Sequence, residues 1–377
     1  MLGCRLSGSF HPVSSSLFVL LAALILGVAE TRELGFNYST TSNSPSSSSI
    51  PAVFVFGDST VDAGNNNYIK TTSKSNFPPY GKDFPTHTAT GRFSNGRLVT
   101  DFVASYVGLK GDIRVYLDPS LTLQDLRNGV CFASASSGFD PLTALQSGVI
   151  SIQKQLQFLK EYRSRMEGYI GKEATSTLIS KAVFIISAGT NDFVVNYYGA
   201  DPIRRQTFTL PAYQHFILQL VQQFLQGLLE MGARNIAFVG LPPMGCLPAV
   251  ITLNSGNSLA HRSCVESLSA LSRDYNRLLQ AKLTAMQQSH GARVFYIDIY
   301  KPLDEMIRNP QQFGFENVNR GCCGSGMLES SYLCNSLSAV CPDDSKYVFW
   351  DAIHPSQAAY YNIFKSIRPI IDGFLKD

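Results

Sequence analysis

Short uninterrupted runs of hydrophobic residues alternate along the chain with longer amphipathic stretches. The hydrophobic runs occupy residues 52–56, 182–187, 235–239, 293–299 and 347–350. Continuous apolar runs of this length are typical of strands buried on both faces, as in a parallel sheet. Between them, apolar residues recur at helical spacing and predict helices over residues 152–166, 213–231 and 264–290. Gly232 and Gly291 follow the last two stretches and favour helix ends there.

Strands that alternate with helices predict βαβ units and an α/β fold with a parallel sheet. No internal repeat or linker interrupts the chain after residue 50, so we expect one domain over residues 51–377. Ligands of open parallel sheets bind beyond the carboxyl ends of the strands. Three of the five runs lead into polar loops with reactive side chains, at residues 57–59, 189–192 and 351–354.

The N-terminal region has the pattern of an export signal. Arg5 is followed by the uncharged apolar stretch Leu17–Val28, and Gly27 and Ala29 supply the small residues that a signal peptidase reads. This pattern predicts a signal peptide over residues 1–29, because the apolar stretch is short for a membrane span. An uncleaved membrane anchor is the alternative. The mature protein is then expected to be secreted, without a stable membrane span.

A Ser/Thr-rich stretch separates this signal from the folded region. Residues 39–49 read STTSNSPSSSS, so we expect residues 30–50 to form a flexible leader. Asn37 begins an Asn-Tyr-Ser triplet, which is a glycosylation acceptor in a secreted chain. The formal net charge is only +3 over 377 residues, and no run is rich in Lys or Arg. This charge gives no basis for nucleic-acid binding, and the sequence leaves the oligomeric state unknown.

Eight cysteines are distributed unevenly along the chain. Cys4 leaves with the predicted signal peptide, and six of the remaining seven lie after residue 245. In an oxidising compartment they are expected to form disulfides, with Cys246 paired to Cys264. The other four form two bridges of undetermined connectivity: Cys322, Cys323, Cys334 and Cys341. A zinc site is the alternative, although no Cys-x-x-Cys spacing occurs. Cys131 remains as a lone, buried thiol.

The polar loops contain the three groups of a nucleophilic triad. Ser59 follows a buried strand and a glycine, where a strand-to-helix turn would present its hydroxyl near a helix N-terminus. Serine needs a base in contact, and His354 is the candidate, with Asp351 three residues earlier to orient its imidazole. The alternatives are a helix cap at Ser59 and a surface turn at Asp351 and His354. His87, in a polar loop, is a second candidate base.

Acyl transfer also requires hydrogen-bond donors for the developing oxyanion. Asn191 has a side-chain amide at the end of a predicted strand, and Gly138 offers an unobstructed backbone N–H. The backbone N–H of Ser59 is the third candidate donor. The alternatives are an ordinary turn residue for Asn191 and an ordinary loop glycine for Gly138. The apolar stretch at residues 193–198 either lines an acyl pocket or packs against the sheet.

Seven motifs occur in a fixed order from about Pro51 to the C-terminus: VFGDSTVDAGNNN, GRFSNGRLVTDFVA, NGVCFASASSGFD, AGTNDF, GLPPMGCLP, RGCCGSG and DAIHPS. This series closely resembles the plant GDSL esterase/lipase family, a branch of the SGNH hydrolases. The resemblance implies a flavodoxin-like three-layer α/β/α fold with a mostly parallel five-stranded sheet. The pentapeptide GxSxG of the α/β-hydrolase lipases is absent.

The same resemblance implies a role for each candidate residue. Ser59 would be the nucleophile and first oxyanion donor, Gly138 and Asn191 the other donors, and His354 and Asp351 the base and its orienting acid. The implied activity is hydrolysis of carboxylic esters through an acyl-enzyme, without metal or cofactor. Acyl transfer to an alcohol is an alternative that uses the same residues, and a catalytically inactive secreted binding protein is an alternative from another class.

Overall fold

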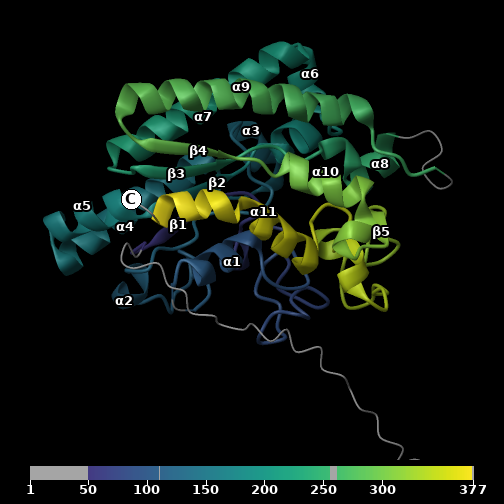
Figure 1. Ribbon diagram of the computed structural model, residues 1–377, viewed down its shortest axis with the longest axis horizontal. Coiled ribbons are helices and arrows are strands. Elements are labelled where there is room, and N and C mark those ends of the chain that lie inside the picture. Colours follow the sequence, from purple (N-terminus) through teal and green to yellow (C-terminus); the bar gives the residue numbers. More distant parts are fainter. Residues whose placement is uncertain (1–49, 110, 255–260, 376–377) are drawn as a thin grey trace, which may run out of the picture. The chain divides into compact units, whose positions relative to one another are not determined.

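Strands and helices alternate along the part of the chain that the computed structural model describes, which comprises residues 50–109, 111–254 and 261–375 (Figure 1). The predicted signal peptide, almost all of the predicted leader, and Asn37 lie outside these residues. The strands are β1 (Val53–Gly57), β2 (Val183–Ser187), β3 (Asn235–Val239), β4 (Arg293–Ile297), β5 (Asn317–Gly321) and β6 (Tyr347–Phe349). The helices are α1 (Val99–Tyr106), α2 (Leu123–Leu126), α3 (Pro141–Ser147), α4 (Ile152–Ile170), α5 (Lys172–Lys181), α6 (Ile203–Thr207), α7 (Leu210–Glu230), α8 (Pro248–Asn254), α9 (Glu266–His290), α10 (Tyr300–Arg308) and α11 (Gln357–Leu375).

The main sheet is parallel, with the strand order β1-β2-β3-β4. Residues 128–134 run beside the outer edge of β1, where Val55 donates a backbone hydrogen bond to Val130 and accepts one from Phe132. With this segment counted, the order along the sheet is that of a flavodoxin-like doubly wound fold. The expected fold class is therefore confirmed. The order in which strands are added across the sheet reverses between β1 and β2.

One predicted strand of the main sheet is elsewhere. Residues 347–349 form β6, which pairs with β5 in a separate two-stranded parallel sheet. The prediction of a fifth strand at residues 347–350 in the main sheet is therefore wrong. The sequence of β5, Asn-Val-Asn-Arg-Gly, is too polar to be recognised as a strand by hydrophobic pattern, so the true partner of β6 was missed.

Alternate side chains of the central strands enter two different cores, as the period of two in a strand requires. The aromatic face of the sheet consists of Phe54, Phe56, Phe184, Ile186, Ile236 and Phe238. The aliphatic face consists of Val53, Val55, Val183, Ile185, Ala237 and Val239. Helices α4, α7 and α9 pack on the aromatic face, and α1 and α11 pack on the aliphatic face (Figure 1).

The three long predicted helices are present and extend close to their expected limits. Helix α7 begins three residues earlier than predicted, because Thr209 caps it and Pro211 is accommodated in its first turn. Helix α9 ends at Gly291, whose φ of 61° is left-handed, as expected for a glycine stop. No helix in the described ranges has both the length and the apolar character needed to cross a bilayer.

Three disulfides link the C-terminal cysteines. Cys246 is bonded to Cys264, which confirms the predicted pair. The two bridges of open connectivity are Cys322–Cys341 and Cys323–Cys334. Cys131 is a buried free thiol, as predicted. Its own segment forms the edge of the main sheet beside β1, which accounts for its burial.

Candidate active site

Ser59 lies in a tight turn at the carboxyl end of β1. Gly57 has a φ of 143°, and a Cβ on it would lie 1.9 Å from the carbonyl oxygen of Ser187 on β2. Asp58 closes the turn, since its carboxylate accepts hydrogen bonds from the backbone and the hydroxyl of Thr60 at 3.0 and 2.8 Å. No helix begins at Ser59, so the predicted strand-to-helix turn is wrong. The expected helix is replaced by a turn, in which the Asp58 carboxylate accepts the hydrogen bonds of Thr60.

His354 contacts the Ser59 hydroxyl although the two residues are 295 positions apart. The His354 Nε2 atom lies 2.8 Å from Ser59 Oγ, and His354 Nδ1 lies 2.8 Å from Asp351 Oδ2. All three side chains are nearly inaccessible to solvent. The spacing of three residues between Asp351 and His354 places both in one turn, where Asp351 Oδ1 also accepts the backbone N–H groups of Ile353 and His354 at 2.8 Å.

The Asp351 carboxylate has further donors around it. Tyr80 donates its hydroxyl to Asp351 Oδ2 at 2.7 Å, and Ser330 donates to the same oxygen at 3.3 Å. Burial opposes ionisation of Asp351, but the adjacent His354 and the hydrogen bonds from His354 and Tyr80 outweigh it and lower its pKa. Burial, together with the Asp351 charge, raises the pKa of Tyr80 well above its ordinary value. Tyr80 therefore stays protonated and acts as a donor.

The three candidate oxyanion donors are available for a ligand. Asn191 follows β2, and its amide nitrogen donates one hydrogen to the backbone oxygen of Ser137 at 3.0 Å, which fixes the amide plane and leaves its second hydrogen free. Within the described residues, the backbone N–H groups of Ser59 and Gly138 donate no hydrogen bond to the protein. Buried N–H groups are nearly always paired, so unpaired donors in this region are suited to an anionic ligand group.

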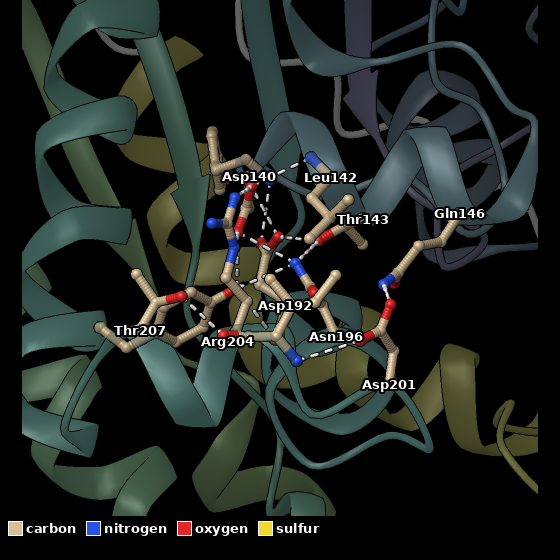
Figure 2. Close-up of polar contacts among 12 residues, drawn as sticks. Asp140, Leu142, Thr143, Gln146, Asp192, Asn196, Asp201, Arg204 and Thr207 are labelled. Atoms are coloured by element: carbon tan, nitrogen blue, oxygen red, sulfur yellow. Dashed lines mark hydrogen bonds and ion pairs between the residues drawn. The ribbon is translucent and has the colours of Figure 1, made fainter.

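Asp192 connects the loop of Gly138 to the loop of Asn191. Its buried carboxylate accepts the backbone N–H groups of Phe139 and Asp140 at 2.9 and 3.0 Å and the Thr143 hydroxyl at 2.7 Å (Figure 2). A Cβ on Gly138 would lie 2.3 Å from Asp192 Oδ1, so only glycine leaves this carboxylate in place. Burial raises the pKa of Asp192 to about 7. The sequence motif contained Asp192, but no pattern indicated this role.

The carboxylate of Asp140 is held from the other side of the same network. Arg204 contacts it through two nitrogens at 2.6 and 2.7 Å, in the paired geometry that guanidinium and carboxylate groups favour. Asn196 and Tyr213 add hydrogen bonds to one of its oxygens at 3.0 and 3.1 Å. Figure 2 shows Asp140 between Arg204 and the start of α3, so this ion pair anchors the loop that contains Gly138.

The disulfide-bonded segment 322–341 supports the turn of Asp351. The backbone N–H of Cys323 donates to the carbonyl of Trp350 at 2.9 Å, and the N–H of Ala352 donates to the carbonyl of Glu329 at 2.8 Å. These bonds lie on both sides of Asp351. The sequence identified the cysteines as disulfides but gave no indication that their segment borders the candidate site.

Two alternatives from the sequence, His87 as the base and residues 193–198 as an acyl pocket, are not supported by the contacts of these residues. The His87 ring is exposed and contacts the backbone oxygen of Lys82, so it does not contact Ser59. Phe193 and Tyr197 belong to the core on the aromatic face, which supports packing rather than an acyl pocket for residues 193–198. Among the described residues, no three His, Cys, Asp or Glu side chains gather in a way that would hold a metal ion.

Comparison with known proteins agrees with this geometry. Residues 53–367 match the family model described as GDSL-like Lipase/Acylhydrolase. The chain is 55% identical over 330 residues to GDSL esterase/lipase At5g45960 of Arabidopsis thaliana, covering 87% of this chain and 88% of that protein. It is 47% identical over 321 residues to GDSL esterase/lipase At1g06990 of the same plant, covering 85% and 89%. With similarity across most of both chains, this protein belongs to the GDSL-like lipase/acylhydrolase family and is a carboxylic ester hydrolase.

Proposed function

We propose that the protein hydrolyses acyl esters by nucleophilic catalysis at Ser59, with His354 as general base and Asp351 as its orienting acid. The single observation that carries this proposal is the continuous contact from Ser59 Oγ to His354 Nε2 and from His354 Nδ1 to Asp351. A hydroxyl, an imidazole and an ionised carboxylate that contact one another in this order form the arrangement that activates a serine.

The reaction proceeds in two steps. The Ser59 oxygen forms a bond to the ester carbonyl carbon, while His354 Nε2 takes the hydroxyl proton. The resulting oxyanion is held by the backbone N–H groups of Ser59 and Gly138 and by the free amide hydrogen of Asn191. The bond from the carbonyl carbon to the alcohol oxygen then breaks, and His354 gives its proton to the departing alcohol.

Water completes the cycle. It attacks the acyl-enzyme and gives a proton to His354, and the bond between Ser59 and the acyl group breaks to release the carboxylic acid. The proton on His354 returns to Ser59. Asp351 stays ionised throughout, which suits its lowered pKa.

Substitution of Ser59 tests this assignment. Ser59→Ala is expected to abolish hydrolysis of p-nitrophenyl acetate and labelling by a fluorophosphonate probe, while the circular dichroism spectrum and thermal unfolding stay unchanged. Ser330→Ala, which removes only the longer contact to Asp351, is the matched control and should retain most of the activity. A Ser59→Ala protein that turns over the ester at the parental rate excludes the mechanism. Absence of probe labelling in the parent would favour an inactive binding protein.

We also infer that residues 1–29 direct export, that the single hydrolase domain spans residues 51–377, and that Asn37 accepts a glycan. The three disulfides in the described residues support an oxidising compartment. Expression of the full chain in plant cells tests export. The medium should contain a protein that begins near Glu30, and endoglycosidase treatment should lower its mass only while Asn37 is present. Retention of residues 1–29 on a membrane-bound product would favour an anchor.

A further inference from the structure

The two faces of the main sheet are packed to different degrees. On the aromatic face, Phe184, Ile186 and Ile236 are completely inaccessible. On the aliphatic face, Ile185, Ala237 and Val239 each retain 7% of their exposed surface. These residues belong to the same two strands and alternate along them, so depth within the protein does not explain the difference. On β1 the aliphatic residues Val53 and Val55 retain only 1% and 0%, so the open space lies against the aliphatic residues of β2 and β3.

The open space is a continuous cavity that begins at the candidate active site. Its lining includes Ser59 and Asn191 at one end and Val53 and Val183 at the other. Its volume is about 90 Å³. One wall is the aliphatic face of the sheet, and the facing wall is formed by α1 and α11.

Each facing helix presents one regular apolar stripe to the cavity. Val99, Val103 and Val107 repeat every four residues along α1 and just past its end. On α11 the lining residues recur every three or four positions, from Tyr360 to Phe374. This spacing places them on a single face of the helix. The cavity is thus bounded along its whole length by regular elements, and its shape is set by the fold.

Polar side chains are concentrated at the catalytic end. Asp58, Ser59, Thr60, Ser187 and Asn191 lie there, where the strands end. From Ile185 down to Val183 the strand residues that line the cavity are apolar. This distribution suits a ligand with a polar group near Ser59 and an apolar portion beneath the sheet.

We propose that this cavity binds the acyl chain of the substrate and that the protein prefers esters of linear medium- to long-chain fatty acids. The proposal rests on the ester hydrolysis assigned to Ser59 and names its substrate class. The carbonyl carbon would lie at Ser59, and the hydrocarbon chain would extend between α11 and the aliphatic face toward Val183. An acetyl group would leave almost the whole cavity unfilled.

The strand register gives the length of the chain that fits. Ser187 is level with Gly57, and Val183 is level with Val53, four residues deeper along the parallel strands. Four residues of strand correspond to roughly 13 Å. An extended chain advances roughly 1.2 Å per bond, so the path from Ser187 to Val183 matches the length of an acyl chain of about ten to twelve carbons. Ala237, level with Ile185, lies halfway along this path.

The wild-type preference for chain length is the first test. The kcat/KM for p-nitrophenyl esters, measured below their critical micelle concentrations, should rise at least tenfold from acetate to decanoate. Each buried methylene strengthens apolar binding about fourfold, so even partial burial gives this rise. A flat profile, or a fall from acetate to decanoate, overturns the proposal.

Two substitutions that block the cavity at different depths provide the second test. Ala237→Leu fills the middle, so decanoate turnover should fall at least tenfold, while acetate turnover changes less than twofold. Val183→Phe fills the deep end and should spare octanoate but reduce dodecanoate. Ala281→Leu, on the exposed side of α9, is the matched control and should leave the whole profile unchanged. Equal loss of acetate and decanoate turnover in a folded Ala237→Leu protein overturns the proposal.

Direct binding separates failure of the cavity from failure of the catalytic assignment. Titration calorimetry of Ser59→Ala protein with decanoic acid should show saturable binding that Ala237→Leu in the same background weakens at least tenfold. Binding can be measured without turnover, so this experiment remains informative when a variant has no enzymatic activity. Hydrolysis of acetate by Ser59→Ala protein would refute the nucleophile alone, whereas absence of decanoic acid binding would refute the acyl site alone.

Discussion

Replacement of Asp192 by asparagine tests whether the proposed oxyanion donors are positioned by one buried carboxylate. Asp192 accepts backbone hydrogen bonds from Phe139 and Asp140 on separate oxygens, and Thr143 donates to one of them. Asparagine has nearly the same shape but only one acceptor oxygen. Its NH₂ group would therefore point at a backbone N–H, so at least one of the two backbone bonds is lost.

The size of the effect follows from that lost bond. A buried N–H without a partner costs roughly 1–3 kcal/mol, and the loop of Gly138 can relieve the cost only by moving away from Asn191. Complete loss of an oxyanion donor raises the barrier by about 3–4 kcal/mol. Partial displacement should therefore lower kcat about 10- to 100-fold. KM should change little, because the donors act on the transition state more than on the bound ester.

The assay compares kcat, KM and thermal unfolding of Asp192→Asn with those of Thr143→Val. Thr143→Val removes one hydrogen bond to the same carboxylate but keeps both backbone bonds, so its kcat should fall less than threefold. The rate of fluorophosphonate labelling should follow kcat, since the phosphonyl oxygen uses the same donors. An Asp192→Asn protein with unchanged kcat, or with a raised KM alone, would refute the positioning role.

Two further predictions concern the supports of the site and the buried carboxylates. Replacement of both Cys323 and Cys334 by serine should lower the free energy of unfolding by about 3 kcal/mol, as measured by urea unfolding. It should also reduce kcat for ester hydrolysis, because their segment is hydrogen-bonded to Trp350 beside the proposed triad. Full activity of the double variant would contradict this. Burial raises the pKa of Asp62 to about 6, above its value in the unfolded chain, so the folded state takes up a proton first as the pH falls. The contribution of Asp62 to stability is complete at about pH 4 and is lost as the pH rises through 6. Between pH 7.5 and 4.5 the free energy of unfolding, measured with urea, should therefore increase toward acid in the parent relative to Asp62→Asn. Parallel plots of this free energy against pH for the two proteins would contradict the prediction.

Hydrophobic pattern alone was sufficient to locate the four strands of the main sheet and the three long helices. Continuous apolar runs identify strands buried on both faces, and β1 to β3 are such strands, whereas only Val294 and Ile297 of the edge strand β4 are buried. The edge position filled by residues 128–134 was not predicted, although residues 130–133 form an apolar run as long as the one at 347–350. This segment pairs with β1 through isolated backbone contacts. Strand β5 was missed for a different reason, because its residues are mostly polar.

The candidate triad could be predicted because each member follows a recognisable strand and has a distinctive chemistry. The supporting residues could not. Tyr80 reaches Asp351 from 271 positions away, in a loop that has no periodic pattern. Asp192 was visible in the motif, but its role depends on a contact with backbone N–H groups, which every residue except proline possesses. Sequence identifies side chains with unusual chemistry, and it does not identify which backbone groups those side chains meet.

Two features of the strands, their order in the sheet and the alternation of their side chains, account for the candidate active site and the proposed acyl site. The order in which strands are added across the sheet reverses between the parallel strands β1 and β2, so the loops after these two strands diverge and leave Ser59 and Asn191 facing the same opening. The strands below that opening place large side chains on one face and small ones on the other. The large side chains close the core against α4, α7 and α9, and the small ones leave space against α1 and α11. Because the alternation is a property of the strand backbone, space beneath the sheet starts at Ser59, the proposed nucleophile. A change at Ala237 should therefore alter chain-length preference without altering the proposed chemistry at Ser59.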